Sequence, residues 1–319
     1  MRSDDGDQSA DDSGDEPERP APPPLARLYG ERPEAPDWFN AALMDAPERS
    51  TIDVQGAAIE LLSWGRRGDP GLLLLHGNSA HADWYSFIAP LVAQAGYRVA
   101  AMSFSGMGGS AWRERYGLLQ WSDEALAAAE AAGLFDAPVA PWVAAHSFGG
   151  FALMTAAARW GRRLRGAMIV DAPLRTREQQ AQRDERRRKP QPARVYLSPE
   201  EALMRFRFLP PQRCEHLFVV DHIARYSLKA VDGGWTWRFD PFLFRDFQFG
   251  TPIRDLGQAQ CPLVLVRGAR SRLVTPALLD YALAQSPPGT TTAEVADADH
   301  HVMVDQPLAF AELLKQALR

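Results

Sequence analysis

The chain has 319 residues, of which 46% are hydrophobic, and its formal net charge at pH 7 is -5. A chain of this length and apolar content can bury one large core or two small ones. The negative net charge gives no indication of a nucleic-acid-binding protein.

The two cysteines, Cys214 and Cys261, form neither a disulfide framework nor a C-x-x-C motif, which favours a reducing cytoplasm. The histidines do not pair at metal-ligand spacing, so we expect no metal and no cofactor. Met1-Arg2 leads into acidic residues rather than into the apolar stretch of a signal peptide. No apolar run approaches the length of a membrane span. These features predict a cytoplasmic protein without a membrane span, and they carry no signal for an oligomeric state.

The first 26 residues, 1–26, are rich in Asp, Ser, Gly and Pro and contain almost no large apolar residue. Such a segment buries too little surface to offset its ordering entropy, so we expect a solvated, disordered tail. One α/β domain is expected over residues 27–319. It opens with a short helix before residue 50, followed by strands near residues 52–54 and 58–64.

Strand and helix signals alternate through the rest of the chain. Continuous apolar runs are typical of strands that are buried on both faces of a parallel sheet. The alternation predicts a mainly parallel, eight-stranded sheet that is flanked by helices. Besides the two early strands, we expect strands near residues 72–75, 98–103, 141–145, 166–170, 263–267 and 291–296, and helices near 84–95, 118–132, 148–160, 276–285 and 306–318.

The segment of about residues 174–250 is too long for one crossover between strands, so the core is expected at 51–173 and 251–319. We expect the segment to form a helical lid over the carboxyl edge of the sheet, where ligands bind in such sheets. Its beginning is basic, which we interpret as a solvated helix face rather than a phosphate or anion site, with docking of the acidic tail as a further alternative: Arg175, Arg177, Arg183, Arg186, Arg187, Arg188, Lys189 and Arg194. Its end is aromatic, and several of these rings are expected to face an apolar substrate: Trp235, Trp237, Phe239, Phe242, Phe244, Phe247 and Phe249.

Ser147 stands at the end of an apolar, strand-like run and directly before a helix-like one. Small residues two positions to either side, Ala145 and Gly149, permit a tight strand-to-helix turn. This is the nucleophile-elbow arrangement, with alanine in the first glycine position. The turn exposes the serine oxygen beside a helix N-terminus, where backbone N–H groups stabilise developing negative charge. A buried serine in a small-residue turn is the alternative interpretation.

Another apolar run ends at His76-Gly77-Asn78. A glycine just past such a strand lets the loop fold back over the carboxyl edge of the sheet. The backbone N–H of Asn78, or of Ser79, then faces the same point as the N–H of Phe148, and two converging donors make an oxyanion hole. We expect His76, Gly77 and Ser79 to contact the substrate, with a simple strand terminator as the alternative.

His300 follows the last expected strand, and Asp305 and Pro307 follow it at a spacing that is uncommon by accident. A histidine on such a loop can reach back over the sheet to a serine far away in sequence. We therefore predict that His300 is the catalytic base, with His301 as a competing candidate. His146, next to the serine, is expected to line the substrate site or to pack beneath it.

Together these motifs resemble the α/β-hydrolase superfamily over roughly residues 50–319. The residues that carry the resemblance are 76–77, 103–110, 145–149 and 300–307. The resemblance implies the α/β-hydrolase fold and a triad in the chain order nucleophile, acid, histidine. The family often has an acid at the position of Ser103, and this departure does not affect the chemistry.

The position where the family most often has its triad acid holds Ser271 in this chain. The family has a second arrangement, in which the acid directly follows the core strand before the lid, and that position holds Asp171. The resemblance therefore implies Asp171 as the acid that hydrogen-bonds His300 and stabilises its imidazolium. Asp297 and Asp299 are weaker candidates, and in the alternative Asp171 only caps the loop that enters the lid.

The resemblance implies a serine hydrolase that cleaves a small carboxylic ester or related acyl compound with an apolar acyl or aryl part. Ser147 attacks the carbonyl carbon while His300 takes its proton, and an acyl-enzyme forms and is hydrolysed. One alternative is a carbon–carbon bond hydrolase of the same fold. Another is a non-catalytic protein that binds a small ligand, which the missing acid at Ser271 keeps open.

Overall fold

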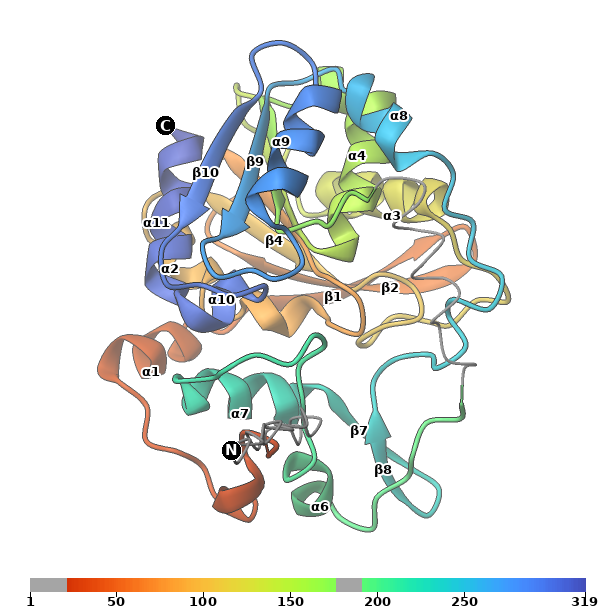
Figure 1. Cartoon of the computed structure of the whole chain (residues 1–319), viewed down its shortest axis with the longest axis vertical. Coiled ribbons are helices and arrows are strands. Elements are labelled where there is room, and N and C mark those ends of the chain that lie inside the picture. The colour runs from red at the N-terminus through yellow and green to blue at the C-terminus, as the bar shows by residue number, and fades with distance from the viewer. Residues whose placement is uncertain (1–21, 176–190) are drawn as a thin grey trace, which may run out of the picture.

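The computed structural model describes residues 22–175 and 191–319, and a large sheet lies at its centre (Figure 1). The sheet has eight strands in the order β1-β2-β4-β3-β5-β6-β9-β10. β1 (Glu48–Val54) pairs antiparallel with β2 (Ala57–Trp64), and β2 pairs antiparallel with β4 (Arg98–Met102). The other neighbouring strands pair in parallel. The predicted eight-stranded, mainly parallel sheet is therefore confirmed.

The central strands are buried on both faces, which is why their sequences are continuously apolar. In β3 (Gly71–Leu75), Leu72 and Leu74 pack in one hydrophobic cluster, whereas Leu73 and Leu75 pack in another on the opposite face. This alternation follows from the two-residue period of a strand. The remaining strands of the sheet are β5 (Trp142–His146), β6 (Gly166–Val170), β9 (Leu263–Gly268) and β10 (Thr291–Val295).

Helices cover both faces of the sheet (Figure 1). One face carries α2 (Ala89–Ala93), α10 (Val302–Asp305) and α11 (Pro307–Leu318), and the other carries α3 (Leu118–Ala131), α4 (Phe148–Trp160), α8 (Pro252–Gly257) and α9 (Pro276–Gln285).

The prediction of a single helix over residues 84–95 is wrong, because the chain forms η2 (Ala82–Tyr85) and then α2. Pro90 lies in the first turn of α2, where its missing N–H starts a new helix instead of continuing an earlier one.

The insertion between β6 and α8 forms a separate layer below the sheet in Figure 1. It contains α6 (Pro199–Leu203), α7 (Leu217–Tyr226) and an antiparallel hairpin of β7 (Leu228–Val231) and β8 (Gly234–Trp237). The expectation of a purely helical insertion is therefore wrong in part. Asp232-Gly233 joins the two strands, and this dipeptide favours tight hairpin turns. Most of the basic run lies within 176–190, outside the described residues.

The N-terminal segment packs against the core earlier than expected. Residues 1–21 of the expected tail lie outside the described part of the chain. Leu25, however, is only 2% exposed and packs in the same hydrophobic cluster as Phe39. Around these two residues the chain forms η1 (Ala26–Leu28) and α1 (Asp37–Met44), while η3 (Gly161–Arg163) extends α4. The boundary that we expected at residue 27 is thus placed too late.

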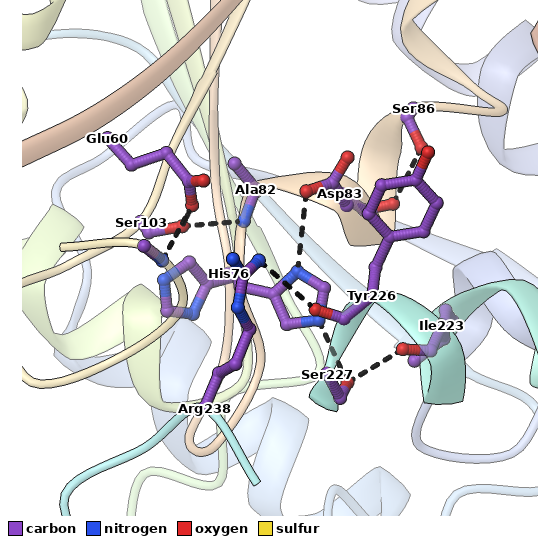
Figure 2. Close-up of polar contacts among 12 residues, drawn as sticks. Glu60, His76, Ala82, Asp83, Ser86, Ser103, Ile223, Tyr226, Ser227 and Arg238 are labelled. Carbon is purple, nitrogen blue, oxygen red and sulfur yellow. Dashed lines mark hydrogen bonds and ion pairs between the residues drawn. The ribbon is translucent and has the colours of Figure 1, made fainter. Parts of the chain in front are cut away.

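Buried polar contacts join the insertion to η2 of the core (Figure 2). His81 Nε2–H donates to Ser227 Oγ at 2.8 Å, and the Ser227 hydroxyl donates to the Ile223 carbonyl oxygen at 2.7 Å. The other ring nitrogen of His81 lies 3.9 Å from a carboxylate oxygen of Asp83 and has no hydrogen-bond partner. Asp83 is fully buried and forms an ion pair with Arg49.

A second buried pair lies beside the first one. His222 Nε2–H donates to Ser86 Oγ at 2.7 Å, and the Ser86 hydroxyl donates to the Asp83 carbonyl oxygen at 2.8 Å. Burial lowers the pKa of His81 to about 3 and that of His222 to about 4. At neutral pH, two uncharged histidines therefore hold α7 against η2.

Candidate active site

Ser147 lies in the turn between β5 and α4, with backbone angles φ 52° and ψ -121°. A positive φ is unfavourable for a residue with a side chain and is typical of functional sites. Surrounding hydrogen bonds hold the turn: Ser147 N–H donates to the Val170 carbonyl oxygen at 2.7 Å, and Gly150 N–H donates to the Ser147 carbonyl oxygen at 2.9 Å. The sharp turn places the serine side chain at the N-terminus of α4, as the sequence predicts.

Two glycines let the loop after β3 pack directly against this turn. A Cβ on Gly149 would lie 2.3 Å from the carbonyl oxygen of His76, which excludes any side chain at that position. A Cβ on Gly77 would lie 3.1 Å from the Cβ of Ser147, which is tighter than an ordinary contact. Glycine is therefore required at position 149, whereas a side chain at position 77 would need its neighbours to shift by a few tenths of an ångström.

His300 connects the serine to a carboxylate. Its Nδ1–H donates to Asp171 Oδ1 at 2.7 Å, and its Nε2 accepts from the Ser147 hydroxyl at 2.9 Å. Because a carboxylate only accepts hydrogen bonds, Nδ1 carries the proton and Nε2 directs its lone pair at the serine. The ring is only 3% exposed. The fold thus brings together the three predicted catalytic residues from the ends of three different strands.

Asp171 is fully buried, and every hydrogen bond to its carboxylate helps to orient it. Oδ2 accepts from Gly268 N–H at 2.8 Å, and Oδ1 accepts from the Ser271 hydroxyl at 2.7 Å in addition to the histidine. Ser271, which occupies the family's usual acid position, is therefore a hydrogen-bond donor to the acid at the second position. The sequence analysis missed this role, although a polar residue at position 271 was the available signal.

The loop that carries His300 is fixed by Asp305. Asp305 Oδ2 accepts from Asp299 N–H at 2.8 Å, and Oδ1 accepts from the Gln212 side-chain amide at 2.8 Å. Burial raises the pKa of Asp305 to about 6. Asp297 forms an ion pair with an arginine of the preceding loop. The acid that follows the histidine in the motif therefore shapes the loop, while Asp171 contacts the ring.

His146 supports the same loop from the end of β5. Its Nε2–H donates to the carbonyl oxygen of His300 at 2.9 Å, and its ring centroid lies 4.8 Å from the His300 ring. The side chain is 3% exposed, and burial together with the nearby His300 lowers its pKa well below the ordinary value. An uncharged His146 adjacent to the nucleophile thus positions the backbone of the predicted base.

His76 lies beneath the loop and is 1% exposed. Its Nδ1–H donates to the Gly77 carbonyl oxygen at 2.7 Å, and its Nε2 accepts from Phe104 N–H at 3.0 Å. Burial lowers its pKa to about 4, so the ring is neutral. Since both ring nitrogens are occupied inside the protein, the structure places this side chain as a support of the loop and not at the expected substrate contact.

Two backbone N–H groups remain for an oxyanion. Phe148 is the first residue of α4, so its N–H has no acceptor within the helix. Ser79 N–H donates to Met107 Sδ at 3.2 Å, which leaves Asn78 as the second candidate donor. Asn78, Ser147 and Phe148 line one cavity. Of the two alternatives that the sequence leaves open, this arrangement favours Asn78.

The cavity at Ser147 has a volume of about 390 Å³, and His300 lies in its wall. Leu209 and Pro210 of the insertion also line it. No local signal in the sequence indicated these two residues, because only the folding of the insertion brings them to the site. The cavity wall contains both polar and apolar side chains. Its polar members include Asn78 and Arg175, and its aromatic residues are Phe148, Phe151, Phe244 and Phe249.

Trp235, which we expected at the substrate site, does not line this cavity. It lies in β8, where its backbone exchanges two hydrogen bonds of 2.8 Å with Tyr196. Its ring packs against the hydrophobic cluster that includes α7. The strand pairing therefore holds the half-buried Trp235 against this cluster and away from the Ser147 cavity.

Within residues 22–175 and 191–319, no group of three or more His, Cys, Asp or Glu side chains is placed to hold a metal ion. In the same part of the chain, no helix is both long enough and apolar enough to cross a membrane.

A family model described as the alpha/beta hydrolase family matches residues 72–313. The chain belongs to the alpha/beta hydrolase family. The match includes Ser147, Asp171 and His300, and it confirms the predicted family. A search of curated proteins found no match.

Solved structures of the same fold include several hydrolases. A thioesterase domain from the curacin biosynthetic pathway has a TM-score of 0.69 and 21% identity, covering 84% of this chain and 99% of its own. E-2-(acetamidomethylene)succinate hydrolase has a TM-score of 0.68 and 18% identity, with 85% and 99% covered. An esterase from Mycobacterium tuberculosis has a TM-score of 0.67 and 23% identity, with 90% and 99% covered. At these identities the likeness establishes the shared fold.

Proposed function

We propose that this α/β-hydrolase cleaves small carboxylic esters, or related acyl compounds, through a covalent acyl-enzyme on Ser147. The observation that carries the proposal is the continuous hydrogen-bonded chain from Ser147 through His300 to Asp171, next to a cavity with phenylalanine rings in its wall. The reason for considering a non-catalytic binding protein was the missing acid at Ser271. The contact between Asp171 and His300 removes that reason.

In the first half-reaction, Ser147 Oγ attacks the carbonyl carbon while His300 Nε2 takes the hydroxyl proton. The backbone N–H groups of Phe148 and Asn78 hold the negative oxygen of the tetrahedral intermediate, because they are oriented before the reaction begins. Asp171 stabilises the imidazolium. His300 then returns the proton to the leaving oxygen, and the acyl group remains on the serine.

In the second half-reaction, water replaces the leaving group. His300 takes a proton from the water molecule, whose oxygen attacks the acyl carbon. The same backbone donors hold the second oxyanion. Collapse of this intermediate breaks the bond to Ser147 Oγ, returns the proton to the serine and releases a carboxylic acid.

The cavity supports a substrate with an apolar acyl or aryl part. Phenylalanine rings form much of its wall, and the insertion closes one side with Leu209 and Pro210. We infer that the insertion is a lid, because these residues reach the cavity from outside the core sheet. The thioesterase and the esterase of the same fold are compatible with acyl-transfer chemistry.

The test is the release of p-nitrophenol from p-nitrophenyl butyrate. We expect an initial burst equal to the enzyme concentration followed by steady turnover, and a mass shift of one butyryl group on Ser147 during the reaction. Ser147→Ala and His300→Ala should each reduce kcat by about 10⁴-fold or more.

Wild-type protein that shows no burst, no acyl adduct and no turnover would contradict the proposal. In that case, cleavage of a dione into an acid and a ketone would indicate a carbon–carbon bond hydrolase. Binding of a small apolar ligand without any turnover would indicate a binding protein.

A further inference from the structure

A second cavity, with a volume of about 200 Å³, adjoins the cavity that holds Ser147. The two cavities share Asn78 and Leu209 in their walls. A small pocket of about 20 Å³ shares Asn78 and Leu209 with both cavities, and both Ser147 and His301 line it. A substrate arm that extends from Ser147 past Asn78 and Leu209 would therefore enter the second cavity.

Aromatic rings form much of the wall of the second cavity. In another protein, an apolar cavity of roughly 150 Å³ binds benzene, so this volume suits one aryl ring with a small substituent. Aromatic walls also favour a planar ring, because offset and edge-to-face contacts are available. The rings come from η2, the insertion and the segment after β8: Trp84, Phe206, Phe208, Trp237 and Phe239.

His301 is the histidine that the triad does not use, and its ring lines the second cavity. The backbone N–H of His301 donates to Gln212 at 3.0 Å, so the Gln212 atom must be the amide oxygen. The same oxygen lies 2.5 Å from His301 Nδ1. Since an amide oxygen only accepts, Nδ1 carries the ring proton. The amide nitrogen of Gln212 correspondingly donates to Asp305 at 2.8 Å.

The opposite ring nitrogen of His301, Nε2, is then a hydrogen-bond acceptor. Burial and the neighbouring His300 and His146 lower the pKa of His301 well below its ordinary value, so the ring is uncharged. The residue is 4% exposed, and Nε2 has no partner among the described residues. A nitrogen without a partner that is not fully buried keeps some accessible surface, and His301 Nε2 is such an atom. Because the ring lines the second cavity, this accessible surface faces the cavity.

We propose that the second cavity is a substrate subsite for an aryl group that carries a hydroxyl or N–H donor, and that His301 Nε2 accepts this donor. The wall also contains Asn78, Ser79, Ser227, Arg205 and Arg207. Ser227 already donates to the Ile223 carbonyl oxygen and accepts from His81, and the two guanidinium groups can only donate hydrogen bonds. His301 is therefore a specificity-determining residue. The inference rests on the proposed function, because it assigns one arm of the substrate that Ser147 attacks.

The experiment measures binding without turnover, in wild type and in Ser147→Ala. The probes are paired 4-hydroxyphenyl and 4-methylphenyl carboxamides of increasing linker length, whose substituents have similar size. Dissociation constants are obtained by calorimetry or NMR titration. At the linker length that reaches the subsite, we expect the hydroxyl probe to bind about tenfold more tightly than the methyl probe.

Two variants separate the ring nitrogens of His301. His301→Asn keeps an amide near the position of Nδ1, where it can still donate to Gln212, and lacks the Nε2 acceptor. His301→Gln places an amide near the position of Nε2. We expect His301→Asn to lose the hydroxyl preference and His301→Gln to retain part of it, whereas general damage to the site would weaken both probes equally.

Equal binding of the two probes to wild type at every linker length would overturn the inference, as would an unchanged preference in His301→Asn. The outcome is independent of turnover. A hydroxyl preference that depends on His301, in a protein that hydrolyses no ester, would refute the proposed function and leave the subsite in place. Ester hydrolysis that depends on Ser147, in a protein without a hydroxyl preference, would support the proposed function and refute the subsite.

Discussion

Among the residues that the structure describes, two serine–histidine pairs, each with an aspartate near the histidine, differ in geometry. In the Ser147 group, formed with His300 and Asp171, the two hydrogen bonds are 2.9 Å and 2.7 Å long. In the Ser227 group, formed with His81 and Asp83, the histidine lies 2.8 Å from the serine but 3.9 Å from the carboxylate (Figure 2).

The two serines differ most in the end of the helix that each one occupies. Ser147 precedes the first turn of α4 with a positive φ, next to the Phe148 N–H, which has no acceptor within the helix. Ser227 follows the last turn of α7 with relaxed angles, φ -81° and ψ -5°, and its hydroxyl donates to a helix carbonyl. A helix C-terminus offers carbonyl oxygens, which would repel an oxyanion.

The two aspartates differ in their partners. Asp171 directs one oxygen at the histidine, and its other hydrogen-bond partners, the Gly268 N–H and the Ser271 hydroxyl, are uncharged donors. Asp83 forms an ion pair with Arg49, and its histidine is uncharged. The position of the serine at a helix end and the partners of the aspartate, more than the residue types, therefore distinguish the Ser147 group from the Ser227 group.

The largest expected difference between the two groups is in reactivity toward a fluorophosphonate. We expect the reagent to phosphonylate Ser147 and release fluoride, and to leave Ser227 unmodified. The rate should fall by about 10⁴-fold or more in Ser147→Ala and His300→Ala. Mass spectrometry of the peptides locates the adduct, and labelling of Ser227 at a comparable rate would break the distinction.

The second largest difference is expected between the two matched aspartate variants, Asp171→Asn and Asp83→Asn. Asp171→Asn should lower kcat for p-nitrophenyl butyrate by about 10⁴-fold, since an amide favours the wrong histidine tautomer. Asp83→Asn should keep kcat within a few-fold. It should lower the free energy of unfolding by about 1–3 kcal/mol, because it removes a buried charge partner of a half-exposed arginine.

Urea denaturation measures the free energy of unfolding of both aspartate variants.

The double exchange Asp171→Ser with Ser271→Asp moves the acid to the family's usual position, and it should recover part of the activity that Asp171→Asn loses. Full activity in Asp171→Asn would show that His300 is oriented by another group.

Ser271→Ala should have an intermediate effect on catalysis. It removes one hydrogen bond to the Asp171 carboxylate and leaves the bond from Gly268. A hydrogen bond to a charged group contributes about 1.5–3 kcal/mol, so kcat/KM should fall by about tenfold to a hundredfold. Ser271→Thr keeps the hydroxyl and serves as the control. Equal losses in both variants would indicate a packing effect.

Acid should weaken the structural contact between η2 and α7. The folded-state pKa of His222, about 4, lies below the ordinary value of about 6.5, so the unfolded chain binds more protons as the pH falls. Below pH 6.5, each such histidine should lower the free energy of unfolding by at most about 1.4 kcal/mol per pH unit, down to its folded pKa. Asp305 opposes this effect below pH 6, because its raised pKa lets the folded chain take up a proton first.

Urea midpoints at pH 7.5 and pH 5 measure this smallest effect. The urea midpoint of His222→Phe should fall less between pH 7.5 and pH 5 than that of wild type. The variant lacks one of the histidines whose protonation is unfavourable in the folded state. Ser86 still donates to the Asp83 carbonyl oxygen in this variant. An identical loss of stability in the variant and in wild type would exclude His222 as a source of the acid sensitivity.

Much of the molecule was predictable from local patterns. Continuous apolar runs gave the central strands, since a strand buried on both faces needs apolar residues at every position. The residues around Ser147 predict the elbow, because the turn demands small neighbours such as Gly149. The split of the helix at Pro90 and the hairpin turn at Asp232-Gly233 had local signals that a broad helical interpretation overlooked.

Local patterns in the sequence predict the individual strands, the turn that carries Ser147 and the loop that carries His300, because each of these depends on residues that are close together in the chain. Only the tertiary structure decided the partners: Asp171 rather than Asp297 faces His300, Ser271 donates to that acid, and Trp235 packs away from the cavity. These outcomes depend on distances between segments far apart in sequence. Such distances are set by how strands and insertion pack, and no local pattern encodes them.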